Sequence, residues 1–266
     1  MPFTKGHAYG NDFLCVDARH VSHARLDVLA REMCERHTGI GADGLMVYDD
    51  DDGQQARMKL FNADGGVAEV SGNGVRVLAA LLLREAGSVH AEVTIDTEGG
   101  AKRLCRTGID RGRQVFRAAM GLPRDLCQVL LAIDGERLTL TTMNFGNPQC
   151  VILGPLPDEA RFARLGAALE RHSLFPQGTN VEFASVEAPD RVRILIWERG
   201  VGPTSSSGTG SCASLVAAAA FGGAARSAEV MAPGGPQRVE WESDHVYLTG
   251  WAELVCDGRW SRALPL

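Results

Sequence analysis

Two short stretches of this chain join a serine to closely spaced glycines. Ser71 begins the motif SGNGVR and Ser207 begins SGTG, and each motif runs into an apolar segment rich in alanine. The first N–H groups of a helix have no partner within the helix and carry a partial positive charge, and glycine lets a ligand approach them closely. The two motifs therefore predict a carboxylate-binding site flanked by two serines. The N–H groups concerned belong to Gly72, Asn73, Gly208 and Thr209.

Serine is also among the best residues for capping a helix, so either motif alone favours a capping role. The matched pair, about half the chain apart, favours chemistry instead. One side chain on each side of a substrate suits the removal of a proton from one face of a carbon and the delivery of a proton to the other. We therefore take Ser71 and Ser207 as the candidate catalytic residues.

The elements that must position these serines follow the same order in both halves of the chain. Each half reads as strands, a helix, a hairpin, the glycine turn, an apolar helix and further strands, with the first apolar helix expected from Gly72 to about Ala86. This internal duplication predicts an α+β fold of two pseudo-symmetric lobes, each with strands wrapped around a central helix, and an active-site cleft between them. The N-terminal lobe is expected to comprise residues 1–117 and 252–266, and the C-terminal lobe residues 118–251.

Composition excludes several classes of function. The 266 residues carry a net charge of -6 and contain no basic cluster, which argues against a nucleic-acid partner. No apolar run reaches the roughly 18 residues of a spanning helix, and the N-terminus lacks the apolar core of a signal peptide. The seven cysteines are odd in number and have no metal-binding spacing. We therefore expect a cytoplasmic protein without metal and without a membrane partner.

Eight motifs in a fixed order carry a resemblance to a known family. They are GNDF at Gly10–Phe13, GIGADG at Gly39–Gly44, FNADG at Phe61–Gly65, SGNGVR at Ser71–Arg76, GNPQCV at Gly146–Val151, GTNVEF at Gly178–Phe183, ERGVGPT at Glu198–Thr204 and SGTG at Ser207–Gly210. Over essentially its whole length the chain resembles the diaminopimelate epimerase family, which shares a two-lobed fold with proline racemases.

The resemblance implies a function and a set of binding residues. It implies a cofactor-independent epimerisation at an amino-acid α-carbon, from LL- to meso-diaminopimelate, in the biosynthesis of lysine and cell-wall precursors. The partner would be a small amino-acid substrate with its α-carboxylate at the two central helices, and the protein could form a homodimer. The far end of the substrate would be held by Asn62, Asn147, Asn180, Glu198 and Arg199, with a further loop contact from Asn11.

The chain departs from the family at the reacting groups. Where the resemblance implies two catalytic cysteines, this sequence has Ser71 and Ser207, and Gln149 stands where the family has histidine. A serine hydroxyl is far less acidic than a thiol and needs an adjacent base, and the sequence shows no such base next to either serine. Cys212, in the second apolar helix, is expected to be buried packing.

Three interpretations therefore stay open at the level of sequence. The chain could be an epimerase with a base that the sequence does not reveal. It could be a relative that performs an elimination or isomerisation, using Glu198 or Asp64. It could also bind a diamino-dicarboxylate without turning it over, as an engineered exchange of both cysteines for serine would produce.

Overall fold

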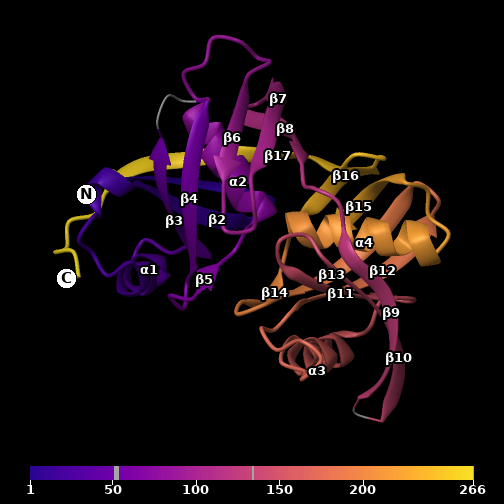
Figure 1. Ribbon diagram of the computed structural model, residues 1–266. Coiled ribbons are helices and arrows are strands. Elements are labelled where there is room, and N and C mark those ends of the chain that lie inside the picture. The colour runs from indigo at the N-terminus through magenta and orange to yellow at the C-terminus, as the bar shows by residue number, and fades with distance from the viewer. Residues whose placement is uncertain (51–53, 134, 266) are drawn as a thin grey trace. The chain divides into compact units, whose positions relative to one another are not determined.

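The computed structural model describes residues 1–50, 54–133 and 135–265, and the chain divides into two compact units (Figure 1). Unit 1 comprises Met1–Ala118 and Gly250–Leu266, and unit 2 comprises Ala119–Thr249. Strands dominate both units and each contains two α-helices among its described residues. The predicted α+β class is confirmed.

Unit 1 holds the first part of the chain and receives its end. Its helices are α1 (Leu26–Cys34) and α2 (Gly72–Leu82), with the short 3-10 turn η1 (Ala18–His20) before α1. Its strands are β1 (Pro2–Ala8), β2 (Asn11–Asp17), β3 (Gly44–Asp50), β4 (Gln55–Asn62), β5 (Val67–Ala68), β6 (Glu92–Asp96), β7 (Lys102–Asp110) and β8 (Arg113–Ala119).

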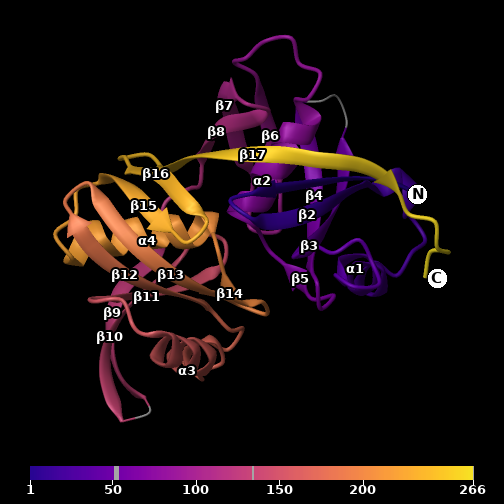
Figure 2. The ribbon, with the colours of Figure 1, turned by 180° about the vertical axis from the view of Figure 1, so that it is seen from behind.

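Unit 2 repeats this order. Its helices are α3 (Glu159–Glu170) and α4 (Gly208–Phe221). Its strands are β9 (Arg124–Ile133), β10 (Glu136–Asn144), β11 (Pro148–Leu153), β12 (Asn180–Ala188), β13 (Arg191–Glu198), β14 (Gly202–Thr204), β15 (Ser227–Ala232) and β16 (Gly235–Trp241). The last strand, β17 (Val246–Arg259), pairs with β16 in unit 2 and then with β1 in unit 1, where Figure 2 shows it in yellow.

The strand pairings confirm the pseudo-symmetry of the two units. In unit 1, β1 and β2 are antiparallel, β2 and β3 are parallel with α1 between them in sequence, and β3 and β4 are antiparallel. In unit 2, β10 and β11, β11 and β12, and β12 and β13 repeat these three relations around α3. The hairpin of β6 and β7 corresponds in the same way to that of β15 and β16.

The central helices are buried along most of their length, and apart from Asn73 and Arg76 of α2 their buried side chains are small or apolar. The first eleven residues of α4, 208–218, are all buried, and the helix packs against β11, β12, β13, β15 and β16. Residues 72–80 of α2 are buried as well, against β1, β2, β6 and β7. The helix predicted to reach Ala86 ends at Leu82, because the next N–H groups, of Arg84 and Ala86, turn back to the carbonyls of Leu81 and Leu83.

Candidate functional site

The N-terminus of α2 is capped by the first of the two serines. Ser71 has extended backbone angles, and its Oγ accepts a hydrogen bond of 3.1 Å from the N–H of Gly74. Both this serine and the first residues of the helix, Gly72 and Asn73, are buried. The predicted cap is therefore present, and it holds the Ser71 hydroxyl at the positive end of the helix.

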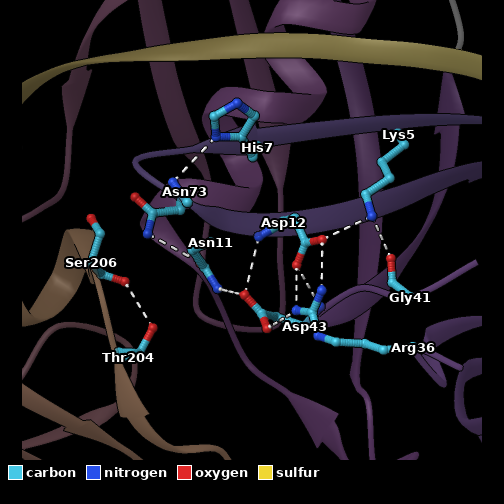
Figure 3. A network of polar contacts seen from close by, with 11 residues as sticks. Lys5, His7, Asn11, Asp12, Arg36, Gly41, Asp43, Asn73, Thr204 and Ser206 are labelled. Atoms are coloured by element: carbon cyan, nitrogen blue, oxygen red, sulfur yellow. Dashed lines mark hydrogen bonds and ion pairs between the residues drawn. The ribbon is translucent and has the colours of Figure 1, made fainter. Parts of the chain in front are cut away.

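A polar network holds Asn73 and Asn11 in place at this helix start (Figure 3). The Asn73 side-chain amide donates to Oδ1 of Asn11 at 3.1 Å, and the Asn11 amide donates to Oδ2 of Asp43 at 2.7 Å. Asp43 in turn accepts from the guanidinium of Arg36 at 2.8 Å, and the same guanidinium donates to both carboxylate oxygens of Asp12. Two predicted binding residues, Asn11 and Asn73, are thus fixed by direct contact.

A buried cation lies one turn further along α2. Arg76 is fully buried, and its guanidinium donates to Oδ1 of Asn73 and stands 5.6 Å from the centre of the Tyr9 ring. A Cβ at Gly250 would collide with the Arg76 Nη1 atom, so a larger residue at this point of β17 would displace the buried guanidinium. Arg76 adds positive charge beneath the start of α2, where a carboxylate is expected.

The N-terminus of α4 repeats the cap in unit 2. Ser207 has extended backbone angles, and its Oγ accepts from the N–H of Gly210 at 3.1 Å. Asn147 donates to Oγ1 of Thr209 at 3.3 Å, and the side chain of Gln149 donates to Oδ1 of Asn147 at 2.7 Å. Gln149 therefore orients a predicted binding residue at the helix start.

The serines have no hydrogen-bonded base among the residues that the structure describes. The Oγ atoms of Ser71 and Ser207 bond to the N–H groups that they cap. Ser207 nevertheless has a carboxyl group close by. A Cβ built on Gly210 would lie 2.6 Å from Oε1 of Glu182 and 3.1 Å from the Oγ of Ser207, so both oxygens face the space left by this glycine. The sequence shows no base next to Ser207 along the chain, and the fold brings this carboxyl close to it from another strand.

Glu182 is the residue that sequence reasoning missed. It belongs to β12, is fully buried, and has no hydrogen-bond partner at either carboxylate oxygen among the described residues. Burial away from water, and next the charge of Glu198, raise the pKa of Glu182 well above the usual 4.5. A carboxyl between the apolar Val181 and Phe183 was the available signal, because an ionisable residue on a buried strand is rare without a partner or a role.

The remaining predicted residues lie at strand ends. Asn180 begins β12 and Glu198 ends β13, and Oδ1 of Asn180 accepts the backbone N–H of Arg199 at 2.9 Å. The Arg199 guanidinium donates to the carbonyl of Gln177, one of the residues around a depression of about 250 Å³ lined by Pro148 and 174–178. These residues of unit 2 are brought together because β12 and β13 are antiparallel, so the start of β12 lies beside the end of β13.

Three other residues from the sequence analysis have distinct surroundings. Asn62 ends β4 in unit 1, and its backbone bonds to Gly66 and Gly65. Asp64 accepts the N–H of Gly66 at 2.8 Å, which is the bond of a turn-forming aspartate. Cys212 is fully buried in α4.

No cluster of three or more metal-ligating side chains occurs in the described part of the chain, and none of its helices could cross a membrane.

The comparisons with known proteins identify the family of the chain. The sequence model of the diaminopimelate epimerase family matches residues 3–123 and 141–255. The chain belongs to the diaminopimelate epimerase family. Curated diaminopimelate epimerases, which are isomerases, match along their whole length. The protein of Desulforudis audaxviator is 39% identical over 279 residues, covering 99% of this chain and 100% of the relative. That of Desulfitobacterium hafniense is 36% identical over 277 residues, covering 97% of each chain.

Solved structures show the same fold at much lower identity. A probable proline racemase from Agrobacterium radiobacter, with bound carbonate, superposes with a TM-score of 0.77 at 16% identity, covering 98% of this chain and 92% of that one. A hydroxyproline epimerase from Agrobacterium vitis, with bound trans-4-hydroxy-L-proline, has a TM-score of 0.76 at 15% identity, covering 97% and 91%. The chain therefore adopts the fold of these racemase and epimerase structures.

Proposed function

We propose that this protein epimerises LL-diaminopimelate to meso-diaminopimelate without a cofactor, as part of lysine and cell-wall precursor biosynthesis in the cytoplasm. Membership of the family supports the substrate class, and the matched serine caps of α2 and α4 support the reaction type. In this proposal the N–H groups at both helix starts hold the α-carboxylate, and Ser71 and Ser207 transfer protons at opposite faces of the α-carbon.

The far end of the substrate is assigned to the strand-end residues. Asn147 and Asn180 supply amide groups, Glu198 pairs with the distal ammonium, and Arg199 offers a planar fork to the distal carboxylate. Asn62 and Asn11 contribute from unit 1.

A second function is favoured by one observation. Both serine hydroxyls accept the N–H groups that they cap, and in the described structure neither hydroxyl is hydrogen-bonded to a base. A serine in that state is a weak proton acceptor. The alternative is a homologue that binds the diamino-dicarboxylate without epimerising it, or that carries out an elimination or isomerisation.

Incubation with LL-diaminopimelate in deuterated water tests the proposal. Epimerisation by proton transfer at both faces exchanges the α-hydrogen for deuterium as meso-diaminopimelate accumulates, which proton NMR and chiral chromatography follow separately. Calorimetry with the same ligand measures binding. Binding without exchange, or formation of an unsaturated product, would replace the proposal by the second function.

A further inference from the structure

Glu182 is a buried carboxyl group that the packing of unit 2 leaves without a hydrogen bond. Neither of its oxygens has a partner among the described residues, and the side chain is fully buried beneath Gly210, the third residue of α4. A carboxyl in this situation costs free energy, of the order of 1–3 kcal/mol for each unsatisfied polar group. Such a group is expected where chemistry requires it.

The other unit shows that packing does not need a carboxyl at this place. Met46 occupies the corresponding position of β3, two residues after Gly44, as Glu182 stands two residues after Asn180 in β12. A Cβ on Gly74 would lie 3.1 Å from the Met46 sulfur, so a thioether fills the same space under α2. The two positions differ in proton chemistry and not in their role in the fold.

The geometry around Gly210 gives the carboxyl access to Ser207. Both Oε1 of Glu182 and the Oγ of Ser207 lie within 3.1 Å of the place where a Cβ of Gly210 would be. The Ser207 oxygen already accepts the Gly210 N–H, so the hydroxyl hydrogen of Ser207 is free to turn towards an acceptor. A rotation of either side chain, or one bridging water, joins the two groups.

We propose that Glu182 is a positioning residue that exchanges a proton with Ser207 and so enables this serine to act on the substrate α-carbon. The inference rests on the proposed function. Ser207 Oγ takes the α-proton while its own hydroxyl proton passes to a carboxylate oxygen of Glu182. The electron pair of the broken C–H bond stays on the α-carbon, and Glu182 becomes the neutral acid. The reverse step returns a proton to the same face.

The surroundings of Glu182 suit this role. The charged and titratable groups that face it are Glu198 on β13 and the thiol of Cys150 on β11. Burial raises the pKa of the Cys150 thiol, and the charge of Glu182 raises it further. The start of α4 adds its positive end. A carboxylate with a raised pKa is a stronger base than an ordinary one. Exchange at the Ser207 face should therefore increase as the pH rises through the pKa of Glu182.

Glu182→Gln, placed both in the wild-type chain and in Ser207→Cys, tests the inference. The amide keeps the shape but cannot accept the proton. In the wild-type chain we expect α-deuterium exchange to fall about 100-fold or more, with its pH dependence lost and ligand binding unchanged. In Ser207→Cys the thiol ionises by itself, so the same change should cost less than about tenfold. Met46→Leu, the matched substitution under Gly74, should leave exchange within about threefold of wild type.

Equal losses in the two backgrounds would show that Glu182 acts through the fold alone and would overturn the inference. Absence of exchange in the wild-type protein, with exchange in the Ser71→Cys, Ser207→Cys double variant, would also overturn it while leaving the proposed recognition intact. Absence of binding and exchange in both would instead remove the proposed function.

Infrared spectroscopy supplies a readout that does not depend on turnover. The proton held by Glu182 should give a protonated-carboxyl band that Glu182→Gln removes, and Ser207→Ala should shift that band. A protonated-carboxyl band at the same frequency in wild type and in Ser207→Ala would overturn the inference, whichever substrate the protein uses.

Discussion

The starts of α2 and α4 have the same backbone and different side chains beneath it. Each begins with a serine whose Oγ accepts the N–H three residues later at 3.1 Å. Under the third residue of the helix lies the Met46 thioether in unit 1 and the Glu182 carboxyl in unit 2. The duplicated scaffold thus fixes the helix geometry equally, while single side chains make the proton chemistry unequal.

The same contrast recurs one turn further along the helices. Five residues after the serine, α2 has the buried guanidinium of Arg76 and α4 has the buried thiol of Cys212. The positive charge of Arg76 favours an anion at the start of α2. The start of α4 instead has the Glu182 carboxyl, which can hold a proton. The two matched halves therefore differ in the side chains that lie near their serines.

Restoring thiols at both helix starts should have the largest effect. Ser71→Cys together with Ser207→Cys is expected to raise α-proton exchange by orders of magnitude, because a thiol at a helix N-terminus is far more readily ionised than a hydroxyl. Of the single variants, Ser71→Cys should gain more than Ser207→Cys, since Ser207 already has Glu182 beside it. Proton NMR in deuterated water measures all four proteins. A wild-type rate equal to that of the double variant would contradict the expected weakness of serine.

Adding a methyl group under each helix start separates the two environments by stability. Gly210→Ala places a Cβ 2.6 Å from a buried carboxyl oxygen and should destabilise the protein by about 1–3 kcal/mol. Gly74→Ala meets a flexible thioether at 3.1 Å and gains helix propensity, so its net effect should stay within about 1 kcal/mol. Urea unfolding of the two variants measures both. Similar losses would mean that the neighbouring side chains do not matter.

Copying the unit 1 residue into unit 2 should stabilise the protein while it abolishes the proton acceptor. Glu182→Met removes an unsatisfied buried carboxyl, which is worth about 1–2 kcal/mol at neutral pH. The raised pKa of Glu182 means that its contribution to stability is fully present below 4.5 and is lost as the pH rises towards the raised value. Thermal unfolding across pH should therefore show the gain from Glu182→Met growing with pH. A gain that is independent of pH would contradict a buried titrating carboxyl.

The smallest effect is expected from the network that supports the start of α2. Burial raises the pKa of Asp12, but hydrogen bonds from Arg36 and Lys5 outweigh it and lower the pKa below the usual 3.8. Asp12→Asn should cost about 1 kcal/mol, because the partners are partly exposed. The contribution of Asp12 is present above pH 3.8 and is lost as the pH falls through its lowered pKa. Acid unfolding of Asp12→Asn should therefore lack this loss of stability at low pH. An acid transition identical to that of the wild-type protein would show that the Asp12 ion pair does not contribute to it.

The sequence by itself determined the features that depend on neighbours along the chain. The serine caps, the apolar central helices and the repeated order of elements are local patterns, and the structure has them all. The strand β9 was not predicted, because its apolar and polar residues do not alternate in the sequence. In the structure all of its residues are exposed or half-buried, and Leu130 is 82% exposed.

Only the tertiary structure decided what lies beside each serine. Glu182 stands far from Ser207 in the chain, and the sequence shows it merely as one residue of the motif GTNVEF. The pairing of β12 with β11 and β13 under α4 brings the carboxyl to Gly210, and the missing side chain of that glycine opens the way to Ser207. Local propensity cannot encode such a contact, because it arises from the burial of a helix against strands that are distant in sequence.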